Sequence, residues 1–183
     1  MFKKPNKAKM TGLFLVFLWI VLWNVIYQVL HHRGLLEFGS VEIKNWSFFI
    51  AVTIFFMQEE LSYLERFVHT LVGGIVGLLL GCCVPLGVKF LMTSAGMTDS
   101  TGAIIIMLVI AIAALILLNP ICPIVFNNVG FCYFIISLIN SSTAVEELPS
   151  NIVSLVAGSI CLNLGCIGIL TLYKKSMAKK MSK

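Results

Sequence analysis

Long apolar stretches separated by short polar connections dominate the pattern of this sequence. Six such stretches occupy about 11–30, 45–58, 67–88, 102–118, 121–140 and 150–172. A helix needs roughly 20 apolar residues to cross a bilayer, because the hydrocarbon core is about 30 Å thick. The pattern therefore predicts an all-α, polytopic membrane protein with six transmembrane helices, which together form a single transmembrane domain over residues 1–183.

The second stretch, WSFFIAVTIFFM, is short and fills a span only if residues from about Val41 or Gln58 are counted. A buried or interfacial segment is the alternative, and it would leave five spans. The flanking charges favour six, because short basic flanks stay on the cytoplasmic side and place both termini there. Those flanks contain Lys3, Lys4, Lys7 and Lys9 before the first stretch, and Lys174, Lys175, Lys179, Lys180 and Lys183 after the last.

Composition supports a lipid environment. The chain is 59% hydrophobic and 11% charged, with a mean hydropathy of +1.00, whereas soluble domains are nearer half apolar and a quarter charged. The net charge of +5 is explained by topology and by attraction to anionic head groups of the lipid bilayer, which is the first expected partner. Nucleic-acid binding is not expected, since no separate folded basic surface is available.

A sequence similarity links the third and sixth stretches. LVGGIVGLLLGCC begins at Leu71 and LVAGSICLNLGCI begins at Leu155, and FFIAVTIF in the second stretch aligns at the same offset with CYFIISLI in the fifth. Three-helix units that repeat in this way enter the membrane from opposite sides. We therefore expect two inverted repeats, about 11–95 and 96–172, between basic cytoplasmic tails at 1–10 and 173–183. Coincidence is the alternative, because Leu and Gly are common in membrane helices.

Small residues form a stripe along each of the repeated helices. The expected packing positions are Thr70, Gly74, Gly77 and Gly81 in the third stretch, and Ser154, Gly158, Cys161 and Gly165 in the sixth. Small residues let membrane helices approach closely, because lipid gives no hydrophobic reward for association. We expect the two stripes to pack against each other or to serve a homo-oligomer. Packing alone is the favoured role for the glycines.

Polar residues at membrane depth are the candidates for chemistry, because each needs a partner or a hydrated cavity. The candidate solute pathway consists of Arg66, His69, Asn127, Asn128 and Asn163. For Asn163, interhelical hydrogen bonding and pathway lining remain open alternatives.

Two prolines interrupt the stretch LLNPICPIVFNNVG between the fourth and fifth apolar segments. The simpler interpretation is a tight cytoplasmic turn, with proline in the first turn of the fifth helix. The alternative is an interrupted helix whose backbone groups and amides face a cavity, as in transporters.

Signatures of catalysis and metal binding are missing from the sequence. The six cysteines lie in or beside apolar segments and behave as small hydrophobic residues. No nucleophile elbow, zinc motif or phosphate-binding loop is present. The histidines lack thiol or carboxylate neighbours at ligand spacing. We therefore expect no enzyme activity, no cofactor and no metal.

Several motifs carry a resemblance to known families. NWSFFIAVTIFF, RFVHTLVGGIVGLLLG, PIVFNNVGFCYFI and LPSNIVSLVAGSICLNLG occur in that order from about Trp46 onward. Together they resemble a family of small six-helix bacterial inner-membrane proteins catalogued as a domain of unknown function. More distantly, Arg66, Thr70 and Gly74 are similar to a helix signature in the membrane domain of fusaric acid resistance and aromatic acid exporter proteins. His69 departs from that signature, and the large cytoplasmic domain of the exporters is missing.

Two functions follow as hypotheses. A channel or transporter for a small solute is favoured by the inverted-repeat signal and the amides at membrane depth. A non-transporting scaffold or accessory subunit is the alternative, and it would bind its partner through Gly77 and Gly81. Under either hypothesis, the resemblance implies a protein of the bacterial inner membrane. The substrate, coupling ion and direction of transport do not follow from the sequence.

Overall fold

Four helices among the described residues are long and apolar enough to cross a lipid bilayer, which marks the chain as a membrane protein. The computed structural model describes residues 7–58, 60–139 and 141–181. Its regular structure is helical apart from one short hairpin. The four candidate spans are Met10–His32, Tyr63–Thr93, Ser100–Leu117 and Ala144–Lys179.

The first long helix leads into a hairpin rather than directly into another span. Helix α1 covers Lys7–His32 and is followed by strands β1 (Glu37–Phe38) and β2 (Val41–Glu42), which pair antiparallel. Gly39 connects the strands with a φ of +65°, a conformation that glycine adopts without steric cost.

The hairpin docks on the beginning of helix α6 (Ala144–Gly158). The Glu42 amide donates a hydrogen bond to Ser150 Oγ at 3.0 Å, and the Lys44 amide donates to Ser154 Oγ at 2.7 Å. Lys44 Nζ also lies 2.7 Å from Glu147 Oε2. These contacts fix the position of the chain just before the next helix.

The second and fifth expected spans are short helices. Helix α2 covers Asn45–Met57 (13 residues) and helix α5 covers Asn128–Ile139 (12 residues). At 1.5 Å per residue they measure about 20 and 18 Å, less than the bilayer core of about 30 Å. The alternative of a buried segment thus describes α2 better than a full span does. The fifth helix also begins later than the expected residue 121.

Local capping explains where two of the long helices begin. Helix α3 covers Tyr63–Thr93 and begins with a capping box, in which the Glu65 amide donates to Ser62 Oγ and Glu65 accepts from the Ser62 amide. Helix α4 covers Ser100–Leu117 and begins after Asp99, whose carboxylate accepts from the Thr101 amide at 3.0 Å.

The last long helix contains a widened turn. It consists of α6, the π-helical segment η1 (Ser159–Leu164) and α7 (Gly165–Met181). The indole nitrogen of Trp19 in α1 donates to the Cys161 carbonyl in η1 at 3.3 Å. Turns of this kind are rare and occur often at functional sites. The tail expected from residue 173 is helical as far as Met181.

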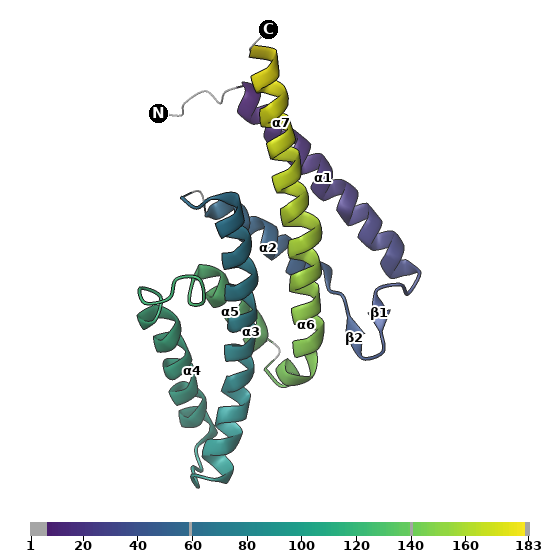
Figure 1. The fold of residues 1–183 in the computed structure, drawn as a ribbon. Helices are drawn as coiled ribbons and strands as arrows, with labels where there is room; N and C mark the ends of the chain where they lie inside the picture. The colour runs from purple at the N-terminus through teal and green to yellow at the C-terminus, as the bar shows by residue number, and fades with distance from the viewer. Residues whose placement is uncertain (1–6, 59, 140, 182–183) are drawn as a thin grey trace.

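Each short helix packs on a long helix from the other half of the chain. Helices α3 and α6–α7 run in opposite directions (Figure 1). Helix α5 packs against α3, whereas α2 packs against α6 and η1. Helix α4 covers α3, and α1 contacts α7 and η1. The two halves of the chain are therefore interleaved. Helix α4 lies on the outside of α3, and α1 lies on the outside of η1 and α7.

The small residues of α3 accommodate α5. A Cβ on Gly77 would overlap the backbone carbonyl of Gly130, and one on Gly81 would overlap the Ser137 side chain. Gly74 instead faces Leu155 of α6. Leu155 does not belong to the small-residue stripe of the last helix. Helices α3 and α6 do contact each other, but the expectation that their two stripes pack against each other is wrong at Gly74, Gly77 and Gly81.

The small residues of the last helix meet α1, α2 and the hairpin connection. A Cβ on Gly158 would overlap the Phe48 ring of α2, and one on Gly165 would overlap the Trp19 indole. Ser154 holds the chain before α2 through the Lys44 amide. These positions are occupied within the chain, so no homo-oligomer is needed to cover them.

The core is centred where the two halves cross. One cluster brings together residues from α2, α3, α5 and α6, among them Ala51, Leu78, Tyr133 and Leu155, all 0% exposed. The start of α1 and the end of α7 lie at one end of the molecule, and the connection between α3 and α4 lies at the other (Figure 1).

Candidate functional site

A cavity of about 610 Å³ with a mixed polar and apolar lining lies between the connection that follows α2 and the connection that precedes α5. We call it the amide cavity. Its polar lining consists of Gln58, Glu60, His69, Asn119, Asn127 and Asn128. Lys174 Nζ in α7 donates to Tyr63 Oη at 3.3 Å, so the beginning of α3 lies beside the basic end of α7. The amide cavity is thus on the same side of the molecule as the lysine-rich end of α7.

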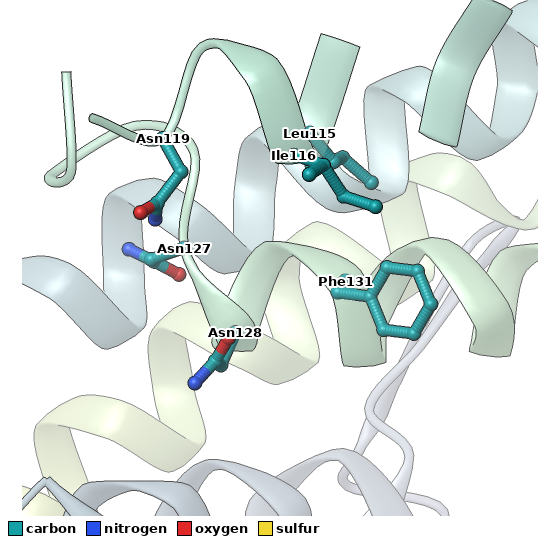
Figure 2. A pocket seen from close by; sticks show the side chains of 6 residues that line it. All are labelled: Leu115, Ile116, Asn119, Asn127, Asn128 and Phe131. Atoms are coloured by element: carbon teal, nitrogen blue, oxygen red, sulfur yellow. The ribbon is translucent and has the colours of Figure 1, made fainter. Parts of the chain in front are cut away.

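A second, smaller pocket of about 210 Å³ adjoins it between the end of α4 and the start of α5. Figure 2 shows its lining, in which Asn119 and Asn127 lie near each other while Leu115, Ile116 and Phe131 form the apolar side. Asn119, Asn127 and Asn128 line both pockets. The two spaces therefore share one amide-rich boundary at the N-terminal end of α5.

The chain reaches this boundary through a proline-containing connection. Residues 118–127 form successive turns between α4 and α5, with hydrogen bonds such as Cys122 N–H to the Leu118 carbonyl at 2.9 Å. Pro120 and Pro123 lie within these turns and are exposed. The simpler interpretation of the sequence is therefore right about a turn between the fourth and fifth helices, but wrong in placing proline in the first turn of the fifth helix. Proline disfavours helix at the residue before it, and the side chain of Asn127 accepts from the Gly130 amide at the start of α5, which begins at Asn128.

Asn127 caps α5 and ties it to α3. Its Oδ1 accepts from the Gly130 amide at 3.0 Å, and its Nδ2 donates to the His69 carbonyl at 3.1 Å and the Ile124 carbonyl at 3.0 Å. A Cβ on Gly73 would overlap this side chain. Because both amide atoms are engaged, Asn127 positions the site.

The side chains of Asn128 and His69 are more available to a solute than that of Asn127. The Asn128 side chain is exposed, makes no hydrogen bond within the described part of the chain, and extends away from Phe131 in Figure 2. His69 is half-buried and lines the same cavity one turn before Gly73. These groups can donate hydrogen bonds to a solute that enters the cavity and can accept hydrogen bonds from it.

Arg66 stabilises the connection between α2 and α3. It is 9% exposed, and its Nε donates to the Leu61 carbonyl at 2.8 Å. The guanidinium carbon lies 5.4 Å from the centre of the Tyr63 ring and 6.0 Å from that of Phe55. Such contacts over aromatic faces are attractive. The structure therefore places Arg66 in a packing role beside the cavity.

Asn163 lies away from the amide cavity. It is 0% exposed within η1, and neither its Oδ1 nor its Nδ2 has a hydrogen-bond partner among the described residues. The structure brings together His69, Asn127 and Asn128 of the predicted pathway, but it does not bring Asn163 to them.

The predicted pathway did not include the lining residues Gln58 and Glu60, and it included the amide of Asn119 only in the alternative of an interrupted helix. Gln58 follows an apolar helix and Asn119 precedes a proline, and both patterns are typical of ordinary connections. Only the folded chain shows that the two connections face one cavity. In the part of the chain that the structure describes, no group of His, Cys, Asp and Glu residues is arranged to hold a metal ion.

Comparison with protein-family models, with curated proteins and with solved structures finds no match for this chain. The family resemblance of the sequence motifs therefore stays a hypothesis.

Proposed function

We propose that this protein is a channel or transporter for a small solute, and that the solute path begins at the amide cavity and passes between two inverted halves. The observation that carries the proposal is a cavity with six polar lining residues at the N-terminal end of a short helix in a membrane protein. Non-helical backbone at membrane depth is tolerated where it lines a cavity or is buried in protein. No enzymatic role is included in this proposal.

The arrangement of the helices supports the inverted repeat. Each half contains a long helix, a connection, a short helix and a second long helix, in the orders α1–α2–α3 and α4–α5–α6. The second long helices run in opposite directions (Figure 1). Each short helix packs on the long helix of the other half. Transporters with inverted repeats bind solutes near the interface of the halves, often at broken helices.

The two short helices also meet each other. Tyr133 in α5 donates from its hydroxyl to the Ser47 carbonyl at the start of α2, at 2.8 Å, and both side chains are buried. A polar contact between short helices inside an apolar bundle supports a midplane crossing of the halves. The scaffold alternative lacks such support, since α5 already covers Gly77 and Gly81.

Orientation follows from the charges. Short lysine-rich flanks favour the cytoplasmic side, so we propose that both termini lie in the cytoplasm of a bacterial cell, that the amide cavity opens toward the cytoplasm, and that the hairpin lies outside. Fusions of reporters to each terminus and to the hairpin at Gly39 test this topology. Activity of the two terminal fusions in different compartments would contradict the inverted repeat, which requires both termini on the same side.

Flux into liposomes tests the function. The purified full chain should carry at least one member of a panel of polyols, amides, amino acids and organic acids faster than protein-free liposomes do. Asn128→Leu keeps the side-chain size but removes the free amide, and it should lower that flux about two- to tenfold, the effect of one hydrogen bond. Gln28→Leu is the matched control, because Gln28 is an exposed amide on α1, away from the cavity.

Two outcomes would contradict the proposal. The first is the absence of flux for every solute in the panel with a protein that is folded and monodisperse. The second is an equal loss of flux in Asn128→Leu and Gln28→Leu, since a loss shared with the control would not come from the cavity.

A further inference from the structure

Three polar side chains are buried without partners where α3 contacts η1. Thr70, Ser159 and Asn163 are each 0% exposed. Thr70 Oγ1, Ser159 Oγ and both amide atoms of Asn163 lack a hydrogen-bond partner among the described residues. Burying hydroxyls and amides without hydrogen bonds is costly, and polar residues inside a membrane are usually functional. We call these three residues the hydroxyl–amide cluster.

The packing of the two long helices brings the cluster together. Leu155, Ser159 and Asn163 follow one another at intervals of four residues and so share a face of the helix. Leu155 packs against Gly74 of α3, and α3 runs in the opposite direction (Figure 1). One turn further along, Ser159 therefore reaches the level of Thr70, which precedes Gly74 by one turn. Contact between α3 and η1 agrees with this register.

Other helical hydroxyls in the chain satisfy themselves locally. Thr53, Thr93 and Ser154 each donate to the carbonyl four residues earlier, at 2.7, 2.7 and 2.6 Å. This bond is the usual solution for a hydroxyl in a helix. Thr70 and Ser159 do not make it, although both are helical. Their hydroxyls are therefore available to a ligand.

The chemistry of the cluster matches a neutral ligand. Two hydroxyls and an amide can both donate and accept hydrogen bonds. An ion would need a countercharge at this depth, yet residues 67–88 and 150–172 contain no Asp, Glu, Lys or Arg. Arg66 lies one turn from Thr70, but its guanidinium is held over the rings of Phe55 and Tyr63.

We propose that the hydroxyl–amide cluster binds a small neutral solute that both donates and accepts hydrogen bonds, in the size range from water to urea and glycerol. The cluster forms the inner part of the path that begins at the amide cavity, and it excludes ions. This inference rests on the proposed transport function and narrows its substrate class.

Stopped-flow light scattering on liposomes that contain the full chain tests the inference. The probes are water, glycerol and urea as neutral species, and potassium chloride and sodium acetate as charged ones. The neutral probes should cross faster than in protein-free liposomes, and the charged probes should not. Thr70→Val and Asn163→Leu preserve size but remove hydrogen-bonding atoms, and they should lower neutral flux about tenfold.

Two further variants keep the test decisive. Thr53→Val makes the same substitution at an exposed hydroxyl of α2 and should leave the flux unchanged. Ser159→Ala removes a single oxygen and serves if the larger changes prevent folding, as judged by size-exclusion chromatography. It should also lower neutral flux.

The outcomes separate this inference from the proposed function. Passage of the charged probes overturns the inference and leaves a transporter of another substrate class. Neutral flux that falls no further in the cluster variants than in Thr53→Val also overturns it. If no probe crosses faster than in protein-free liposomes, while other solutes in the panel do, only the inference fails. If nothing crosses, both proposals fail.

Discussion

The contact between α3 and α5 and the contact between α6 and α2 join equivalent parts of the two halves, yet they pack differently. In the first, Gly77 lies against the backbone of Gly130. In the second, Gly158 lies against the side chain of Phe48, and the helix continues into the widened turn of η1. The first contact is therefore the more rigid, because backbone meets backbone, whereas the closest contact in the second is with a ring that can move.

This difference bears on the two proposed polar sites. The backbone contact of α5 with α3 holds Asn127 and the amide cavity in a fixed place. Two of the three residues of the hydroxyl–amide cluster, Ser159 and Asn163, lie instead in η1, where the regular hydrogen-bond pattern of the helix is interrupted. A fixed amide cavity beside a cluster at an irregular turn would suit the solute path that we propose.

The largest effect is expected at the backbone contact. Gly77→Ala should destabilise the protein by about 3 kcal/mol or more, because the new Cβ overlaps a carbonyl that no side-chain rotation can move. Gly168→Ala is the matched control, since a Cβ there meets nothing within 4 Å. It should stabilise the helix by about 0.5–1 kcal/mol. Thermal unfolding in detergent measures both, and equal effects would contradict the rigid contact.

A smaller effect is expected at the corresponding contact of the other half. Gly158→Ala should cost about 1–3 kcal/mol, because the Phe48 ring must shift. Combining it with Phe48→Leu should restore part of the loss relative to the two single variants. A double-mutant cycle on unfolding free energies measures this coupling. Strict additivity would show that the two residues do not collide.

The attachment of α1 to the widened turn should be weaker still. Trp19→Phe removes the hydrogen bond to the Cys161 carbonyl and should cost about 0.5–1.5 kcal/mol. Trp23→Phe is the control on the same helix, because the Trp23 indole nitrogen is buried without a partner among the described residues. That variant should be neutral or slightly stabilising. A greater loss in Trp23→Phe than in Trp19→Phe would contradict the role of the Cys161 carbonyl.

The smallest effect is expected at the docked hairpin. Lys44→Met keeps the aliphatic chain but removes the ion pair with Glu147. The side chain of Lys44 is 18% exposed and that of Glu147 is 30% exposed. The loss should be about 0.5–1 kcal/mol, since partly exposed pairs contribute little, and it should shrink as salt is added. Melting curves at low and high ionic strength measure it. A loss that does not depend on salt would point to packing instead.

The predicted pathway shows how far side-chain chemistry can be derived from sequence. His69, Asn127 and Asn128 were predictable as polar residues at membrane depth, and the structure gathers them at one cavity. Gln58 was not, because it lies in a connection whose approach to the α4–α5 connection depends on how the two halves pack. Arg66 and Asn163 stood out equally in the sequence, but their neighbours direct one toward aromatic rings and the other into η1.

The sequence by itself determined the four long helices and the basic ends, because length and apolarity are local properties that lipid selects directly. It also determined the position of the small residues along α3 and α6, since their spacing follows from the helical repeat. Only the tertiary structure decided what covers those residues, where α5 begins and which turn widens into η1. These features depend on contacts between residues far apart in the chain, and no local pattern specifies which distant backbone or ring will pack against a given position.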